Sequence, residues 1–178
     1  MTSTAAFIAT SLDGYIARKD GSLDWLDRYS DVAAEDTSYT DFISRIDVIL
    51  MGRRTFEKVL TFGFWPYENM PVRVWSDTLK TLPEELAGKA ALITGTPAEV
   101  LAQLDREAFR RAYIDGGKTI QSFLGAGLLD EITVTQIPVL LGEGISLFGA
   151  LTGDVSLKLQ KSKTLPWGFV QNRYQILK

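Results

Sequence analysis

Three times along the chain, a short apolar run leads through a turn of small residues into a segment whose apolar positions have helical spacing. Each run has the length of a strand, and each following segment has one apolar side, as expected of a helix that covers a sheet. Strands that alternate with helices in this way predict a parallel sheet covered by helices. The runs are Asp47–Met51, Ala90–Thr94 and Arg111–Asp115, and the helical segments are 53–60, 98–104 and 117–124.

Residues at the expected helix ends agree with this pattern. Thr96 is a favourable N-cap, and Pro97 suits the first helical position because its missing N–H would have no helical partner there. Gly125 and Gly127 close the third segment, since glycine adopts the backbone conformation that ends many helices. The pattern in Ala33–Arg45 predicts one more helix, with one buried side.

The remaining apolar runs predict further strands, and those after residue 129 follow one another without a helix between them. Residues 11–22 and 61–70 have the composition of loops, and 166–168 predicts the turn of a hairpin. We expect a single α/β domain over 1–178, three-layer αβα, with a mixed, mainly parallel central sheet and an antiparallel C-terminal hairpin. These strands are Thr4–Thr10, Val72–Ser76, 130–141, Ser156–Leu165 and Phe169–Leu177.

Composition excludes several kinds of chemistry. The chain has no Cys and no His, which excludes disulfides and thiolate catalysis and argues against zinc sites and Ser-His triads, so we predict no metal site. The net charge of -3 and the lack of a long basic run predict no binding to nucleic acid or to a membrane surface. No signal peptide or membrane span is visible, and we expect a cytoplasmic protein whose partners are small molecules.

Two of the predicted helices begin with sequences suited to binding anions. Free backbone N–H groups and the positive end of the helix dipole face a ligand there, and glycine allows its close approach. Arginines and a hydroxyl at the first start suit the 2′-phosphate of NADPH, so we favour NADPH over NADH. The spacing of Gly-Lys-Thr at 117–119 does not match a Walker P-loop. The two starts comprise Gly52, Arg53, Arg54 and Thr55, and Asp115, Gly116, Gly117, Lys118 and Thr119.

Three further groups have both a functional and a structural interpretation. The segment 11–16, which includes Asp13, could close over a bound nicotinamide or form an ordinary Asp-Gly turn. Glu35 and Asp36 could orient or protonate a substrate, or stabilise the first turn of a helix. Trp65 and Tyr67 could stack on a flat substrate or pack a loop.

With these segments in place, the chain resembles the dihydrofolate reductase-like superfamily over nearly its whole length. Within it, the chain is most similar to the C-terminal reductase domain of the riboflavin biosynthesis protein RibD. The last of the matching segments, P-V-L-L-G-E-G-I-S-L-F, is typical of the RibD branch and not of true dihydrofolate reductases. The matching segments are 11–16, 47–56, 113–120, 127–132 and 138–148.

The resemblance implies roles for individual residues. Ala9, Gly14 and Ile16 would border the nicotinamide, and Ser76 would lie near the adenine. Arg53 and Thr55 would meet the adenosine phosphates, while 116–119 would hold the pyrophosphate. The pterin-binding carboxylate of dihydrofolate reductases would correspond to Asp36, with Glu35 or Asp41 as the other candidates, and we expect Asp13, Trp65 and Tyr67 on the substrate side.

The resemblance also implies an activity: an NADPH-dependent oxidoreductase similar to 5-amino-6-(5-phosphoribosylamino)uracil reductase. The alternatives are a dihydrofolate or pteridine reductase, and a non-catalytic NADP-binding sensor or scaffold. Two features depart from the RibD pattern: the sequence has no His or Cys with which to form the zinc site of a deaminase domain, and no basic cluster for a ribose phosphate is visible beyond the cofactor arginines. A homodimer through the C-terminal strands is expected, although core packing explains the apolar residues Leu140, Leu141, Leu147 and Phe148 equally well.

Overall fold

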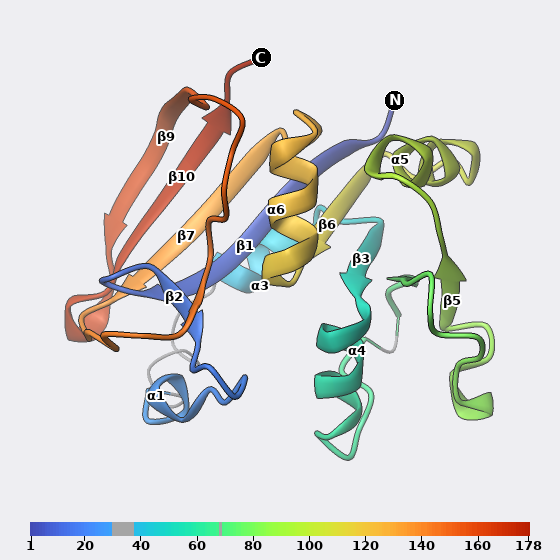
Figure 1. The fold of residues 1–178 in the computed structure, drawn as a ribbon, viewed down its shortest axis with the longest axis horizontal. Helices are drawn as coiled ribbons and strands as arrows, with labels where there is room; N and C mark the ends of the chain where they lie inside the picture. Colours follow the sequence, from blue (N-terminus) through green and yellow to red (C-terminus); the bar gives the residue numbers. More distant parts are fainter. Residues whose placement is uncertain (30–37, 68) are drawn as a thin grey trace.

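A computed structural model describes residues 1–29, 38–67 and 69–178. Its centre is an eight-stranded sheet of order β5-β4-β3-β6-β1-β7-β10-β9 (Figure 1). The first strand of the chain, β1, therefore lies in the interior of the sheet, between β6 and β7, which both come from the second half of the chain. The strands are β1 (Ser3–Ser11), β3 (Val48–Gly52), β4 (Val72–Trp75), β5 (Ala90–Ile93), β6 (Arg111–Asp115), β7 (Glu131–Ile137), β9 (Leu157–Thr164) and β10 (Val170–Ile176).

The strand directions confirm the predicted mixed, mainly parallel sheet. All neighbours from β5 to β7 are parallel, whereas β10 is antiparallel to both β7 and β9. The predicted hairpin joins β9 to β10 through a 3-10 turn (Pro166–Gly168). Parallel neighbours place the carboxyl ends of their strands at one edge of the sheet, where ligands bind in open α/β sheets.

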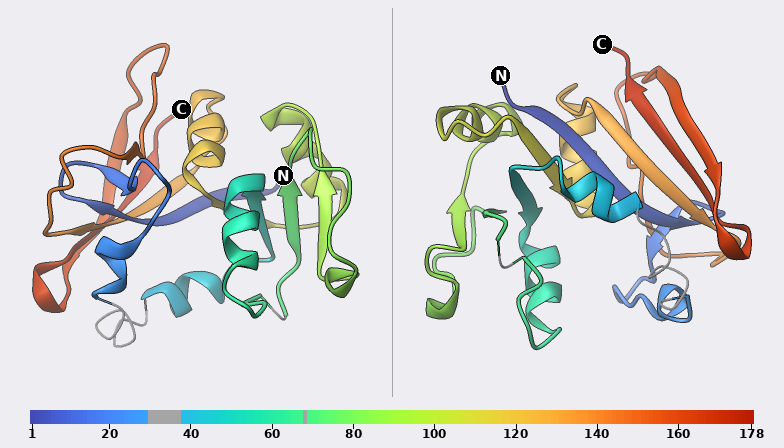
Figure 2. Two further views of the ribbon diagram at one scale, coloured as in Figure 1. Left: turned by 60° about the horizontal axis from the view of Figure 1, so that its bottom comes forward. Right: turned by 180° about the vertical axis from the view of Figure 1, so that it is seen from behind.

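Helices cover both faces, which confirms the three-layer architecture. On one face α5 (Pro97–Arg106) and α6 (Gly117–Gly125) pack on the alternate strand residues that include Leu50. On the other face α3 (Ser38–Ile43) and α4 (Arg53–Leu60) pack on the set that includes Ile49 (Figure 2). Successive strand side chains point to opposite faces, so one continuous apolar run such as β3 supplies both cores.

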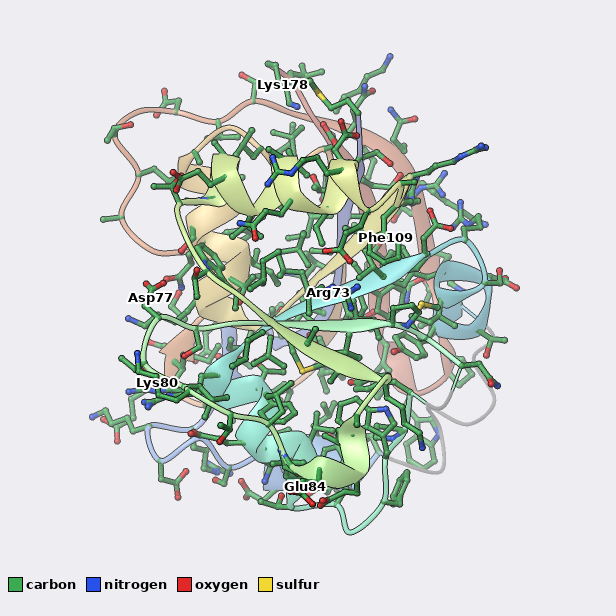
Figure 3. The ribbon with its side chains drawn as sticks, turned by 90° about the vertical axis from the view of Figure 1, so that its right-hand side faces the viewer. Arg73, Asp77, Lys80, Glu84, Phe109 and Lys178 are labelled. Carbon is green, nitrogen blue, oxygen red and sulfur yellow. The ribbon has the colours of Figure 1, made fainter. Side chains whose placement is uncertain are left out.

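Figure 3 shows the side chains at the β5 side of the sheet, where β4 contacts the end of α5. The guanidinium of Arg73 pairs with Glu107 and lies 5.3 Å from the centre of the Phe109 ring. Because the Arg73 side chain is only 16% exposed, this pair and the ring contact stabilise the junction more than a surface ion pair would.

Two sequence expectations differ from the structure, and one helix was not expected. The expected loop 11–22 contains strand β2 (Tyr15–Ala17), which pairs with β8 (Ile145–Ser146) in a small second sheet. A strand this short forms only because a distant segment pairs with it, and three residues are too few to show the alternating apolar pattern by which a strand is predicted. The expected strand 130–141 ends at Ile137, because Pro138 cannot donate to a strand ladder. Helix α1 (Asp24–Asp27) was not predicted, and its Trp25 is fully buried.

Among the described residues, no helix is long and apolar enough to cross a membrane. The apolar residues predicted near a dimer interface are divided between the core and the surface. Leu147 is fully buried, whereas Leu140 is 69% and Phe148 46% exposed. Core packing thus explains only part of this set, and the homodimer stays a prediction.

Candidate functional site

The starts of helices α4 and α6 lie beside each other at the carboxyl edge of the sheet. They follow the neighbouring parallel strands β3 and β6, in which Met51 is level with Asp115. Gly52 precedes α4, and Gly116 precedes α6. The two predicted anion-binding turns, which are more than 60 residues apart in sequence, are therefore brought together.

Each helix places a threonine against the glycine that precedes the other helix. A Cβ at Gly52 would lie 2.9 Å from Thr119 Oγ1, and a Cβ at Gly116 would overlap Thr55 Oγ1. Gly116 also has a backbone φ of 90° with ψ of 139°, a conformation essentially restricted to glycine. The two glycines permit the close approach of the helix starts.

The starts of these two helices differ from that of α5. In α5, Thr96 and Glu99 form a capping box, with the Thr96 N–H donating to Glu99 Oε2 at 2.7 Å. Helices α4 and α6 have no side-chain cap and no acidic residue in the first turn. Instead, exposed cations occupy these turns: Arg53 and Arg54 in α4 and Lys118 in α6. Cations are unfavourable at the positive end of a helix unless an anion binds there.

The loop after β1 lies against the start of α6. Ile16 on β2 covers Gly117 so closely that a Cβ at that glycine would overlap Ile16 Cδ1. The carbonyl of Gly14 accepts the Leu147 N–H at 3.0 Å, which fixes the loop to the segment that leads out of β8. Segment 11–16 therefore lies beside the start of α6.

The carboxylate of Asp13 bridges two loops. It accepts the Ser11 hydroxyl at 2.6 Å and the backbone N–H groups of Leu141 and Gly142 at 3.1 and 2.7 Å. The Ser11 hydrogen bond is the main reason why the pKa of Asp13 lies below its usual value. These contacts use both carboxylate oxygens, so the structure gives Asp13 a positioning role, and its predicted contact with substrate stays a prediction.

Asp115 points to the face covered by α3 and α4, beside the hydroxyl of Tyr113. That hydroxyl lies 3.0 Å from Asp115 Oδ1 and 2.9 Å from the carbonyl oxygen of Phe7. A hydroxyl has one proton, so both contacts can be full hydrogen bonds only when Asp115 supplies the second proton. Burial raises the pKa of Asp115, while hydrogen bonds from Tyr113 and the Gly116 N–H oppose that shift.

The charge of this carboxyl group acts on the hydroxyls of Tyr39 and Tyr67. Burial, followed by the negative charge of Asp115, raises the pKa of Tyr39 to about 12 and also raises that of Tyr67. The Tyr67 ring lies 5.4 Å from that of Trp65, which in turn packs 6.2 Å from Phe56 of α4. The predicted loop packing of Trp65 and Tyr67 is therefore observed, and stacking on a substrate stays a prediction.

Two other predicted positions have definite places. Ser76 follows β4 and is buried, and its Oγ accepts the Leu79 N–H at 3.0 Å. Ala9 is partly buried on β1 near the same edge. Glu35 and Asp36 lie outside the described residues. Asp41, the other carboxylate considered, is exposed on α3.

Comparison with known proteins agrees with the resemblance that the sequence motifs indicate. The family model of the RibD C-terminal domain matches residues 4–170. A candidate riboflavin biosynthesis protein from Shewanella sp. PV-4 is 40% identical, with a TM-score of 0.93 over 99% of this chain and 100% of that one. The uncharacterized protein YwjB of Bacillus subtilis is 36% identical over 90% of both chains.

More distant relatives extend the comparison. The riboflavin biosynthesis protein RibD of Aquifex aeolicus is 26% identical, and this chain matches 52% of its length. A dihydrofolate reductase of Enterococcus faecalis, solved with NADP(H), has a TM-score of 0.66 at 16% identity over 99% of this chain and 97% of that one. The second likeness is one of fold alone.

Proposed function

Because the chain belongs to the RibD C-terminal domain family, whose model matches residues 4–170, we propose that it is an NADPH-dependent reductase of a small heterocyclic substrate. The observation that carries this proposal is the pair of uncapped helix starts at the carboxyl edge of the sheet. Both lack acidic residues in the first turn and carry cations there instead. A ligand with several phosphates matches that arrangement better than a neutral ligand would.

The residues at this edge fit the parts of a dinucleotide. A pyrophosphate would bind the backbone N–H groups at the start of α6, at Gly116 and Gly117, together with Lys118 and Thr119. Arg53, Arg54 and Thr55 would bind the 2′-phosphate, and Ala9, Gly14 and Ile16 would border the nicotinamide, with Ser76 near the adenine. When bound, the cofactor supplies the hydride. The protein then has to orient the substrate, exclude water and provide one proton.

A carboxyl group is the natural source of that proton. Glu35 and Asp36 remain our proposed donors from sequence, and Asp115 is added to them by its position beside the two helix starts. Desolvation favours the protonated form of Asp115, and the hydrogen bonds from Tyr113 and the Gly116 N–H oppose that shift only in part. Tyr113 would hold this carboxyl group in place.

The first substrate we propose is 5-amino-6-(5-phosphoribosylamino)uracil or a similar compound, in line with the family name. Dihydrofolate or another pteridine is the second, and a non-catalytic NADP-binding sensor or scaffold is the alternative outside catalysis. Oxidation of NADPH in the presence of a panel of pyrimidine and pteridine compounds separates these possibilities. Binding of NADPH without any consumption would favour the scaffold.

Cofactor preference provides the first test. We expect NADPH to raise the melting temperature more than NADH does, and Arg53→Ala to reduce this preference by about tenfold in affinity. Lys58→Ala is the matched control, because Lys58 is an exposed cation at the other end of the same helix. The proposal fails if NADH stabilises the protein as much as NADPH does, or if Arg53→Ala and Lys58→Ala behave alike.

A further inference from the structure

A basic hollow lies on the sheet face covered by α3, and no residue of the two helix starts is in its lining. It has a volume of about 120 Å³ and lies between α3 and the β9–β10 hairpin. The right-hand view of Figure 2 shows α3 crossing this face near β1, with β10 and β9 extending beyond it. Its lining contains four cations, Arg45, Lys161, Lys163 and Arg173, and one carboxylate, Asp41. The sequence alone did not show this cluster.

Strand register explains how the cations meet. Phe7, Thr133, Arg173 and Lys161 are level with one another across β1, β7, β10 and β9, so they form one row on one face. Arg173 and Lys161 are thus directly opposite each other on adjacent strands. Like charges in such a pair destabilise a sheet unless an opposite charge lies nearby.

Three of the four cations have no ion-pair partner among the described residues. Arg45, Lys161 and Arg173 take part in none of the ion pairs found there, and Glu131 pairs instead with Arg111 at 2.9 Å. Arg173 is half-buried, and its Nε is buried without a hydrogen-bond partner in this part of the chain. An unpaired buried N–H of a guanidinium is costly, and an anion in the hollow would satisfy it.

The other lining groups suit a small oxyanion. Thr133 and Gln171 are buried polar residues in the floor, and Lys163 contacts the Ser38 hydroxyl at the rim. The volume exceeds what one water molecule requires and admits a tetrahedral anion. The rings of Phe7 and Phe42 form an apolar side. Asp115 is not in the lining, and Tyr113, whose hydroxyl lies 3.0 Å from Asp115 Oδ1, donates to the carbonyl of Phe7.

We propose that this hollow is a second anion site, which binds a phosphate group of a small ligand between α3 and the β9–β10 hairpin. The site is distinct from the cofactor phosphates and does not depend on the proposed cofactor. Arg173 would donate from the floor, and Arg45 and Lys161 would approach from the two walls. Both inorganic phosphate and the phosphate of a sugar phosphate present this chemistry.

The experiment measures binding of inorganic phosphate and of ribose 5-phosphate by calorimetry, using the Arg53→Ala/Arg54→Ala double variant, in which the cofactor arginines are removed. We expect saturable binding to persist in this background. Lys161→Gln and Arg45→Gln should each weaken it by roughly three- to tenfold, because both are exposed partners of a charge-assisted contact. Tighter binding of ribose 5-phosphate would identify a sugar phosphate as the better ligand, whereas equal binding would identify free phosphate.

Lys158→Gln is the matched control, since it removes one cation from the same strand without changing the lining of the hollow.

A second measurement does not require the ligand to be known. Without phosphate and at low salt, Lys161→Gln should be at least as stable as the parent protein, because it removes one of two facing like charges. It should also gain less stability when phosphate is added.

The proposal is overturned if no saturable binding occurs in the double variant, or if Lys158→Gln weakens binding as much as Lys161→Gln does. A third result also overturns the proposal: the protein is a dimer, and Lys161 is protected from amine acylation to the same extent with and without phosphate. The face that carries Lys161 would then be an interface between two copies of the chain. Loss of NADPH binding with intact phosphate binding would instead contradict only the proposed function.

Discussion

Thr55 of α4 lies directly against Gly116, the residue before α6, so closely that a Cβ at Gly116 would overlap its hydroxyl oxygen. The contact joins two strand–turn–helix units that are far apart in the sequence. It keeps two sets of free backbone N–H groups at one place and leaves no room for a side chain between them. The predicted phosphate site depends on this contact.

Gly116→Ala should therefore damage both the fold and cofactor binding. Its backbone conformation costs a residue with a Cβ about 1–3 kcal/mol, and the overlap with Thr55 adds to that cost. We expect a loss of about 2–4 °C in Tm for each kcal/mol in a chain of this size. Gly125→Ala is the control, because a Cβ there meets nothing within 4 Å. Equal Tm and equal NADPH affinity for both variants would contradict the assignment.

Asp115→Asn tests the protonation state of this partly buried carboxyl group. The folded-state pKa of Asp115 lies above 3.8, its ordinary value. At any pH between 3.8 and the folded-state pKa, this group therefore binds more protons in the native state than in the unfolded state. The stability contributed by the protonated group therefore falls as pH rises through that window. Asparagine does not ionise, so the variant should gain stability relative to the parent as pH rises above about 4. Chemical denaturation at several pH values measures this, and a pH-independent difference would refute it.

Tyr113→Phe should raise the pKa of Asp115 further. The Tyr113 hydroxyl donates to the carboxylate and lowers its pKa, so its removal leaves desolvation less opposed. The carboxyl stretching band in infrared spectra, identified by its absence in Asp115→Asn, reports the protonated form directly. If the band disappears at a lower pH in Tyr113→Phe than in the parent protein, the orientation of this hydrogen bond is wrong.

Asp13→Asn should lower the Tm at neutral pH by loosening the contact between the loop after β1 and the 141–142 backbone. The folded-state pKa of Asp13 lies below its ordinary value of 3.8, so its stabilisation is present above that value and is lost as pH falls toward the folded-state pKa. The difference between variant and parent should therefore narrow in acid. Asp77→Asn, which removes an exposed carboxylate outside this contact, is the control for the loss of one negative charge.

Thr96→Ala should cost about 1 kcal/mol of unfolding free energy through loss of the α5 capping box. NADPH affinity should stay unchanged, because α5 already has its own N-terminal cap. Denaturant unfolding and a cofactor titration measure the two effects. A large loss of cofactor affinity would show that the start of α5 also contributes to the site.

The sequence by itself determined the local elements and the chemistry of the two helix starts. Apolar runs such as 48–51 and helix caps such as Thr96 involve residues that are close together in the sequence. Their patterns therefore predict the strands, the helices and the mixed sheet. The segment from Gly116 to Thr119 also indicates an anion site through its residue types and its place between a strand and a helix. These features depend on near neighbours along the chain.

Only the tertiary structure decided which distant residues meet. The contact of Thr55 with Gly116, the pairing of β2 with β8 and the row that joins Arg173 to Lys161 all depend on strand order and register. Register is specified by packing across the whole sheet, which no local pattern records. For the same physical reason, the basic hollow was invisible in a sequence whose cations are spread over separate segments.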